Sequence, residues 1–590
     1  MKKLILSIFA AASVMTVAAG TTPGIEYSWA KLIDGSTNAG DQSTSVTVGA
    51  KGGIYWFGTY GSTEADPAVN FDGNFLFDGA LYNAGTSQNN NFTLIKTDAD
   101  GNLLWNVHST YGDFENNAGG SAATSDGGVV VVSKVRHTHG LTDKNVTFVD
   151  ASGTATEIDW ACADPARRNY IMLVTKISAD GKIEWNRQIK FSTEPGPKAS
   201  GNYAGYWSNV FNTTGVTVDG NDNVYVAVNL RNPMYVGKAD GTTHTITPLN
   251  NQNWTGDPQS AVGDFLILGL DKDGYYRNSL TLEGEASTAY CQKVEYAAGK
   301  VYAQGYITGN GTDLKAGSYT LAPSKVMSPV LLCIDTDFDV KWAKCYKGEQ
   351  VQNKKGFQNV GISVVGDNLW MCGQFNLKFT DPDNADNVVT STQGNVREGF
   401  ILKVNAADGK WLAARTSRDD DWNEPSALAK TGLTGYFRVL QNAEKPEKIY
   451  VFGYVMNANV GVFLRQYDAN TLAGNLEEGQ NNIVTKGGVP TCQTIAYDAA
   501  NGAAYFTARG NQAFAMLDGT TTAAPVKWGI LAAKYLLPAD MKTSGIEDIT
   551  VDDDENAPVE YYNLQGIRVV NPSHGIYIRR QGRTATKVAF

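Results

Sequence analysis

The sequence is poor in the residues that most active sites use. It has 5 histidines among 590 residues, and neither Gly-x-Ser-x-Gly nor His-Glu-x-x-His occurs, so no motif indicates a serine hydrolase or a zinc protease. The 6 cysteines form no Cys-x-x-Cys pair, which argues against a cysteine zinc site. Charged residues are only 18% of the chain, the net charge is −11, and no stripe of Lys and Arg is present. These features argue against nucleic-acid binding, which relies on clustered basic residues.

The chain also lacks a long apolar run after its first residues, so no membrane helix is predicted. Residues 1–20 carry two lysines, an apolar stretch and a small-residue end, which is the layout of a secretory signal peptide. We expect cleavage near Ala19 or Gly20 and export of the rest. Because no cysteine lies near that point, a lipoprotein anchor is not expected. Export permits disulfides, but a chain of this size does not need them, and we expect mostly buried, unpaired thiols.

What the sequence has in abundance is one repeated hairpin, here called the Asp-Gly hairpin. Each copy is an apolar run, a polar turn with Asp and usually Gly, and a second strand that usually carries Trp. Clear copies occupy 92–105, 170–185, 265–278, 330–342 and 399–411. A second type, with a Gly/Asp/Asn turn and a strand rich in Tyr and Val, precedes each of them. Its seven copies are centred on Tyr55, Val130, Tyr225, Tyr302, Trp370, Tyr450 and Tyr505.

Together the two hairpins form a unit of four antiparallel strands that recurs along the chain. Such an array predicts an all-β fold, a seven-bladed β-propeller of four-stranded antiparallel blades over 26–540. Two Asp-Gly hairpins are degraded, at 460–474 and at 513–519 followed by 526–537. The segment 26–35 is a lone strand of the type that ends a unit, and it can close the ring as the fourth strand of the last unit. Since 526–537 suits the same position, we expect one of these two segments to pack elsewhere.

The repeat resembles that of a known group of exported proteins. The matching residues are Trp29-Ala30-Lys31, Gly373-Gln374-Phe375 with Asp381-Pro382, Phe400-Ile401-Leu402-Lys403 and Trp342-Ala343-Lys344. They are similar to the SBBP repeats (seven-bladed β-propeller repeats) of exported Bacteroidetes proteins, and the similarity covers roughly 26–537. The resemblance implies the propeller fold and no fixed activity.

The end of the chain is predicted to be a separate module. An acidic linker spans 541–558, and alternating apolar residues in 559–590 predict short strands joined by turns. The tail resembles the C-terminal sorting domain of type IX secretion cargo, in Asn563-Leu564-Gln565-Gly566, Pro572, Gly575-Ile576-Tyr577-Ile578 and Lys587. The usual KxxxK ending appears here as Arg583 and Lys587. The resemblance implies a small β-sandwich-like module that the outer-membrane translocon reads, and secretion or delivery to the cell surface. Its sorting motif is Gly566, Pro572, Gly575, Tyr577 and Lys587.

The predicted binding face lies where the chain is least regular. The longest insertions fall between the second and third strands of a unit (60–91, 136–169, 229–263, 376–398) or between units (191–212, 412–431). Both kinds of connection leave the same face of a propeller, and long loops at such a rim often carry function. Aromatic rings beside carboxylates and amides suit sugar stacking combined with hydroxyl hydrogen bonds. The candidate ligand-binding residues are Tyr203, Tyr206, Trp207, Trp254 and Trp422. The alternative is that these rings anchor the loops to the blades.

Other conspicuous residues have a structural explanation. The Asp-x-Asp-Gly turns at 98–101 and 271–274 lack the ligand ladder of a calcium loop, and Asp and Gly suit a tight hairpin turn. His137 and His139 have no third ligand nearby, so they predict no metal site. The Trp after the turn is expected to fill the gap between neighbouring blades, at Trp105, Trp185, Trp342 and Trp411.

The sequence therefore favours a non-catalytic exported propeller that binds a glycan or a protein through its long-loop face. One alternative is a structural surface component. The other is a glycosidase or lyase that uses paired carboxylates, drawn from Asp419, Asp420, Asp421 and Glu424. A run of adjacent Asp more often marks a solvated loop or a calcium site, so structural calcium is left open and no other cofactor is predicted. The expected partners are this unidentified ligand and the type IX machinery, without nucleic acid.

Overall fold

The computed structural model describes residues 24–35, 42–61, 69–72, 74–75, 90–111, 113–137, 146–158, 169–191, 213–231, 233–249, 263–351, 356–391, 397–417, 433–456, 461–474, 483–486, 491–525, 528–543, 559–564, 567–573, 575–581 and 584–589. The regular structure in these residues is almost entirely β-strand, with a short 3-10 turn at η2 (Ala539–Met541). The predicted all-β class is therefore confirmed.

Within the described residues, seven sheets share one plan, in which four strands run antiparallel in the order first, second, third and fourth. Sheet 1 holds β2 (Gln42–Val48), β3 (Ile54–Gly61), β6 (Asn90–Thr97) and β7 (Leu103–Tyr111). Sheet 2 holds β8 (Asp113–Ala123), β9 (Val129–His137), β12 (Asn169–Ile177) and β13 (Ile183–Phe191). Sheet 3 holds β14 (Thr213–Val218), β15 (Val224–Leu230), β18 (Asp264–Leu270) and β19 (Tyr276–Thr281). Sheet 4 holds β20 (Ala286–Ala297), β21 (Lys300–Gly309), β24 (Ser328–Asp335) and β25 (Val340–Cys345).

The remaining sheets follow the same plan. Sheet 5 holds β27 (Phe357–Val365), β28 (Asn368–Phe375), β31 (Glu398–Asn405) and β32 (Trp411–Thr416). Sheet 6 holds β33 (Leu433–Asn442), β34 (Lys445–Met456), β35 (Val462–Asp468) and β36 (Ile483–Lys486). Sheet 7 holds β37 (Thr491–Asp498), β38 (Ala503–Gly510), β40 (Gly529–Leu536) and β1 (Glu26–Gly35). The seven predicted Tyr/Val hairpins and the five clear Asp-Gly hairpins all form as antiparallel pairs.

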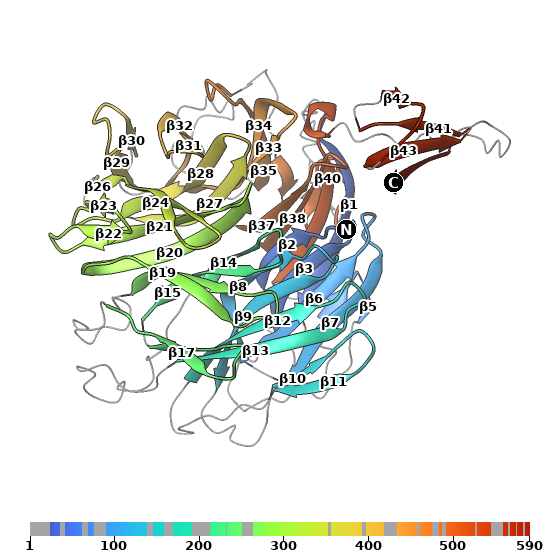
Figure 1. Ribbon diagram of the computed structural model, residues 1–590, viewed down its shortest axis with the longest axis horizontal. Helices are drawn as coiled ribbons and strands as arrows, with labels where there is room; N and C mark the ends of the chain where they lie inside the picture. The colour runs from blue at the N-terminus through green and yellow to red at the C-terminus, as the bar shows by residue number, and fades with distance from the viewer. Residues whose placement is uncertain are drawn as a thin grey trace, which may run out of the picture.

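The sheets are held together by apolar cores between neighbours. A cluster of buried side chains lies between each pair of successive sheets, and another lies between sheet 7 and sheet 1. Because both faces of a sheet are covered, its middle strands are apolar and buried throughout, as in β15 and β18. The first strands, here called the inner strands, also contact one another in succession, from β2 through β8, β14, β20, β27, β33 and β37 back to β2. Figure 1 shows β2, β8, β14 and β37 towards the middle of the molecule.

Sheet 7 is completed by two distant parts of the chain. β1 pairs with β40 along most of its length, and β40 pairs with β38. The segment 26–35 is therefore the fourth strand, as predicted, and 526–537 provides the third. The prediction that one of them packs elsewhere is wrong. Residues 513–519 are not a third strand, because β39 (Ala515–Met516) pairs instead with β36 of sheet 6.

The insertions between second and third strands cover the outer edge of the preceding sheet. β4 (Val69–Phe71) pairs with β1, β10 (Val146–Val149) with β7, and β16 (Met234–Gly237) with β13. Each is followed by a further strand, β5 (Asn74–Phe75), β11 (Ala155–Ile158) or β17 (Thr243–Ile246). β29 (Leu377–Thr380) pairs with β30 (Val388–Thr390) and with β26 (Lys347–Gln350), which follows the fourth strand of sheet 4. The hairpin β22 (Leu314–Ala316) and β23 (Tyr319–Leu321) lies in the corresponding insertion of sheet 4. Since an open edge exposes unpaired N–H and C=O groups, part of each insertion serves the fold.

The tryptophans of the Asp-Gly hairpins pack between sheets. Trp342 donates from Nε1 to the Ala406 carbonyl in the turn of the next sheet, at 3.0 Å. Trp29 and Trp105 do the same to the carbonyls of Ala99 and Ala179, at 3.0 and 3.1 Å. Trp185 lies against Gly274 of the next turn. The predicted packing role is confirmed for these rings.

Trp411 follows the pattern differently. It lies opposite Val404, whereas Trp105 and Trp342 lie opposite Lys96 and Cys333, so Trp411 is displaced along its strand. Its ring packs against sheet 4 instead, with ring centroids 5.8 Å from Tyr346. As predicted, Trp411 fills a gap between sheets, but it is the gap towards sheet 4 and not the one towards sheet 6.

A lysine of the third strand reinforces the tryptophan contact. Lys96 donates to the Ala179 carbonyl at 2.6 Å, the same oxygen that accepts from Trp105. Lys534 shares the Ala99 carbonyl with Trp29 in the same manner, at 2.9 Å. Burial lowers the pKa of Lys96, although Asp180 nearby opposes that shift. In these two copies a lysine of the third strand and a tryptophan of the fourth strand therefore share one contact with the next sheet.

The chain end forms a single layer. β41 (Val559–Tyr562), β42 (Arg568–Val569), β43 (Ile576–Gln581) and β44 (Thr584–Ala589) make one antiparallel sheet in the order β42-β41-β43-β44. No second layer covers it among the described residues, so the sandwich-like expectation is replaced by one sheet. Leu564, Ile567 and Val570 are 64%, 63% and 83% exposed. The preceding folded unit extends to Thr543, whose N–H donates to the Ala499 carbonyl.

Candidate functional site

The aromatic residues predicted to bind ligand cannot be placed. Tyr203, Tyr206, Trp207, Trp254 and Trp422 lie outside the described residues. The same holds for the acidic residues of the enzyme alternative, 419–421 and 424, and for His139. His137 is the last residue of β9, and only its backbone is described. Among the described residues, no group of three His, Cys, Asp or Glu side chains is placed to hold a metal ion.

The sorting-motif residues are partly visible in the C-terminal sheet. Lys587 pairs with Ile578, and Tyr577 pairs with Val588, across β43 and β44. Gly575, just before β43, has a φ of +151°, which favours glycine. Pro572 lies in the connection before it, and Gly566 falls outside the described residues.

The Asp-x-Asp-Gly turns are hydrogen-bonded internally. Asp98 accepts from the N–H groups of Asp100 and Asn102, and from the Asn102 side chain. Asp271 accepts in the same way from the N–H groups of Asp273 and Tyr275. The first aspartate thus caps the turn, which confirms the turn interpretation.

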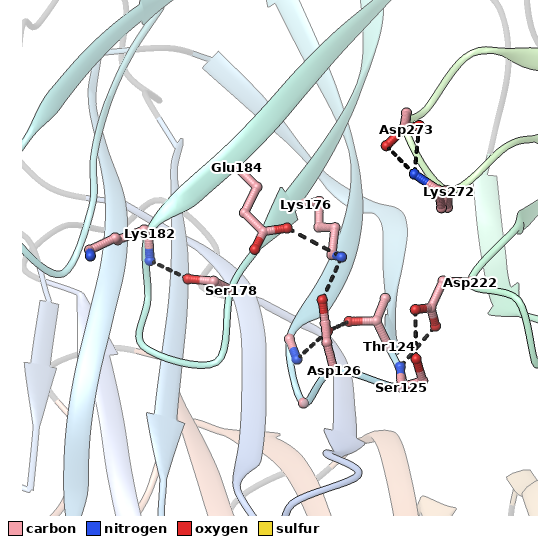
Figure 2. A network of polar contacts seen from close by, with 12 residues as sticks. Thr124, Ser125, Asp126, Lys176, Ser178, Lys182, Glu184, Asp222, Lys272 and Asp273 are labelled. Carbon is pink, nitrogen blue, oxygen red and sulfur yellow. Dashed lines mark hydrogen bonds and ion pairs between the residues drawn. The ribbon is translucent and has the colours of Figure 1, made fainter.

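A polar network joins neighbouring turns on the side of the short connections (Figure 2). Lys176 bonds Asp126 at 2.6 Å and Glu184 at 3.2 Å, and Ser125 donates to Asp222 of the next sheet. Burial alone would raise the pKa of Asp126, but hydrogen bonds led by that from Lys176 lower it to about 2. Because these charged groups already have partners in the neighbouring turns, the network stabilises the turns and is not a candidate ligand site.

Four cysteines, here called the four buried thiols, match the sequence prediction. They are free and buried: Cys291, Cys333, Cys345 and Cys372. Burial raises the pKa of Cys333 to about 11 and that of Cys345 and Cys372 to about 12. Such thiols are poor nucleophiles, so they suit packing and not catalysis.

A cavity lies where the seven inner strands meet, and it is the strongest candidate site. Its lining takes residues from all seven: Thr44, Ser45, Val46, Gly120, Ser121, Gly215, Val216, Lys293, Val294, Glu295, Gly361, Ile362, Phe437, Arg438, Thr494 and Ile495. Its volume is about 130 Å³, and a wider cavity of about 320 Å³ adjoins it towards the ends of the inner strands. Val46, Ser121, Glu295 and Arg438 line both.

A register shift positions these residues in every sheet. In each of the seven pairs of first and second strands, a bulge or irregularity lies just before the cavity-lining residue. Bulges bend a strand and redirect its side chains. The residues at this place are small in five sheets, namely Ser45, Gly120, Gly215, Gly361 and Thr494, and in sheet 2 the register resumes one residue earlier, at Gly119. In sheets 4 and 6 the corresponding residues are Lys293 and Arg438.

The charged residues form a cluster that spans three sheets. Arg438 donates from Nη2 to both carboxylate oxygens of Glu295, at 3.3 and 3.0 Å. Glu295 Oε1 also accepts from the Val364 N–H of sheet 5, at 3.4 Å. Burial raises the pKa of Glu295, while Arg438 and that N–H oppose the rise. Burial, and then the charge of Arg438, lowers the pKa of Lys293 to about 8.

Hydroxyl groups continue the polar lining around the cavity. Ser121 lies 2.6 Å from Ser45 and 2.7 Å from Thr47, measured between side-chain oxygens, which joins sheets 1 and 2. The Val46 N–H donates to Thr494 of sheet 7. Each inner strand is an edge, so side chains of the neighbouring sheet satisfy some of its free backbone groups.

Sequence reasoning missed this cluster, although a signal was present. Lys293 and Arg438 stand at a place where the other five units carry Gly, Ser or Thr, and Glu295 stands at one where the others carry Thr, Ser, Ala or, in sheet 6, Leu440. Charges at positions of a repeat that are otherwise small indicate a role outside the repeat fold. The bulges, which fix the alignment of these positions, are not readable from the sequence.

No protein-family model matches the chain, and no curated protein does. Similar solved structures include quinohemoprotein alcohol dehydrogenase from Comamonas testosteroni, with 12% identity, a TM-score of 0.37, and coverage of 90% of this chain and 78% of that one. A europium-containing methanol dehydrogenase has 10% identity and a TM-score of 0.30, covering 82% and 88%. A rhamnogalacturonan lyase of Bacillus licheniformis has 13% identity and a TM-score of 0.28, covering 83% and 76%. Likeness this weak transfers no activity. In the described part of the chain, no helix is long and apolar enough to cross a membrane.

Proposed function

We propose that the seven sheets are the blades of a β-propeller and that the protein is an exported, cell-surface binding protein. The blade assignment is supported by the cores between successive sheets and by the pairing of β1 with β40. Export and surface delivery rest on the signal-peptide pattern in 1–20 and on the sorting-like tail. The propeller supplies a rigid frame, and binding is its function.

The observation that carries the binding role is the unequal length of the connections. First and second strands are joined by tight turns, such as Gly49–Gly53, and third and fourth strands by capped turns such as 98–102. Apart from 469–482, which joins β35 to β36 in sheet 6, the long segments connect second to third strands or one sheet to the next, so they leave the opposite ends of the strands. Part of their length covers sheet edges, and the rest is available for recognition.

The ligand class we propose is a glycan or a protein, recognised by the aromatic residues of these segments. The purified chain without its leader, 21–590, is tested on a glycan array and as bait in a pull-down. We expect one glycan or protein to be retained, and Trp207→Ala with Trp254→Ala to abolish retention. Leu104→Ala, an exposed position on β7, is the matched control and leaves binding unchanged. If the wild-type chain retains nothing at high concentration, the binding role is overturned.

A further inference from the structure

The cavity between the inner strands carries charges that the fold does not require. The corresponding residues in the other five sheets are small, and those sheets pack as well without charges. Taking a charged group out of water is costly unless it is compensated. Arg438 has Glu295 as its counter-ion, so it is the presence of two cations at positions that are small in the other sheets, and not uncompensated charge, that calls for an explanation.

We propose that this cavity binds a small oxyanion, a carboxylate, sulfate or phosphate group, between Lys293 and Arg438. The residues of this site are different from the loop aromatics of the proposed function. The cations come from equivalent positions of sheets 4 and 6, and sheet 5 between them contributes Gly361. A Cβ at Gly361 would lie 1.7 Å from the Phe437 carbonyl oxygen, so this glycine lets β27 and β33 approach each other closely.

The charge balance of the cluster favours an anion. Two cations face one carboxylate, so the lining keeps an excess of one positive charge when all three groups are ionised. Arg438 bonds Glu295 through Nη2 alone, and its Nη1 and Nε have no partner among the described residues. A guanidinium has five N–H donors in a fixed geometry that suits oxyanions. Donors therefore remain for a ligand.

The cavity also has room and further polar groups for an oxyanion. Its 130 Å³ is several times what one water molecule needs, about 10–15 Å³ on a comparable measure. Ser363 lines the adjoining cavity, is 3% exposed, and its hydroxyl has no hydrogen-bond partner within the described residues. The Thr44 hydroxyl, beside the smaller cavity, also has no partner within the described residues, although Thr44 itself is only half-buried. Buried hydroxyls normally have partners, so these two indicate a bound polar species.

The pKa of Lys293 is compatible with this role. Burial and the neighbouring Arg438 lower it to about 8, which leaves the amine largely protonated at neutral pH in the empty cavity. An anion placed beside it would stabilise the ammonium form. Glu295, on the same strand, is the opposing charge and limits the affinity for anions.

The test is isothermal titration calorimetry of the chain 21–590 with sodium sulfate, sodium phosphate and sodium galacturonate at fixed, low ionic strength. We expect at least one of them to bind, and the comparison separates tetrahedral anions from carboxylates. Lys293→Met should weaken binding tenfold or more, because it removes a charged hydrogen-bond donor. Glu295→Gln, nearly the same size, should tighten binding several-fold, since it removes a repulsive charge and releases Arg438. Lys378→Met, which removes a cation from an exposed pair with Glu349, is the control and leaves affinity unchanged.

A second measurement covers the case in which a cavity variant fails to fold. Selenate soaked into wild-type crystals should give an anomalous peak between the Lys293 and Arg438 side chains. The proposal is overturned if none of the three anions binds at 20 mM, which is ~20-fold above a dissociation constant of about 1 mM. Wild-type affinity for the anion in both Lys293→Met and Glu295→Gln would also overturn the proposal. So would a selenate peak found only at other places in the crystal. Trp207→Ala should leave anion binding intact, so failure of the loop-face proposal is separable from failure here.

Discussion

Replacing Trp342 tests the packing between neighbouring sheets. Its ring is 3% exposed in the core between sheets 4 and 5, and Nε1 donates to the Ala406 carbonyl at 3.0 Å. Trp342→Ala leaves a cavity in that core, and truncating a buried aromatic ring costs about 3–5 kcal/mol. Trp342→Phe keeps most of the ring and loses the hydrogen bond, which is worth about 1 kcal/mol. We therefore expect the two variants to differ by about 2–4 kcal/mol.

The assay is equilibrium urea unfolding of the chain 21–590, followed by far-UV circular dichroism because the substitution itself alters fluorescence. Leu412→Ala serves as the control, since that side chain is 46% exposed on the adjoining sheet and should change stability by less than about 0.5 kcal/mol. A loss below about 1 kcal/mol in Trp342→Ala would show that the ring is not packed between sheets. Equal losses in the Ala and Phe variants would refute the division into packing and hydrogen bonding.

Three further results follow from the same contacts. The pKa of Lys293 is about 8 in the folded chain against 10.5 in the unfolded one, so the unfolded state holds more protons between these values. The free energy of unfolding should accordingly rise with pH from 8 to 10.5. In Lys293→Met, a plot of the urea midpoint against pH should be flatter over this range. An unchanged slope in this variant would count against the lowered pKa of Lys293. The four buried thiols should remain unlabelled by an aromatic disulfide reagent at pH 8 and react once urea is added, whereas labelling of the native chain at these positions would contradict their burial. Asp126→Asn removes an ion-pair partner of Lys176, and the Asp126 side chain is half-exposed. Thermal unfolding should therefore show a loss of stability of only about 0.5–1 kcal/mol. A loss several times larger would mean that the network is more buried than described.

The repeat pattern predicted most of the fold because its physical requirements are local. Alternating apolar residues with Asp and Gly turns define antiparallel hairpins, and these formed where expected. The third strand of sheet 7 was misassigned because 513–519 and 526–537 both resemble strands, and only long-range pairing decides between them. Trp411 was assigned to the wrong gap for a related reason, since a bulge of one residue changes the face of a strand.

The candidate site was less predictable than the fold. Arg438 is far in sequence from Lys293 and Glu295, and the strands that carry them otherwise look like ordinary repeat members. What brings them together is the meeting of the inner strands, which no local pattern encodes. The loop aromatics attracted attention because they break the repeat, yet their role stays a prediction. Parts of the same insertions turned out to pair with sheet edges.

The pairing of β1 with β40 has a consequence for how the protein is made. Val46 of sheet 1 and Thr494 of sheet 7 are likewise hydrogen-bonded across 448 positions of sequence. Sheets 1 to 6 consist of consecutive segments and can form in the order of synthesis, but sheet 7 must wait for both ends of the chain. Contacts of such sequence separation form slowly, and chains that await them expose unpaired strand edges. During biosynthesis β1 is the vulnerable segment, because it is the first strand synthesised and must wait for β40, its partner in sheet 7.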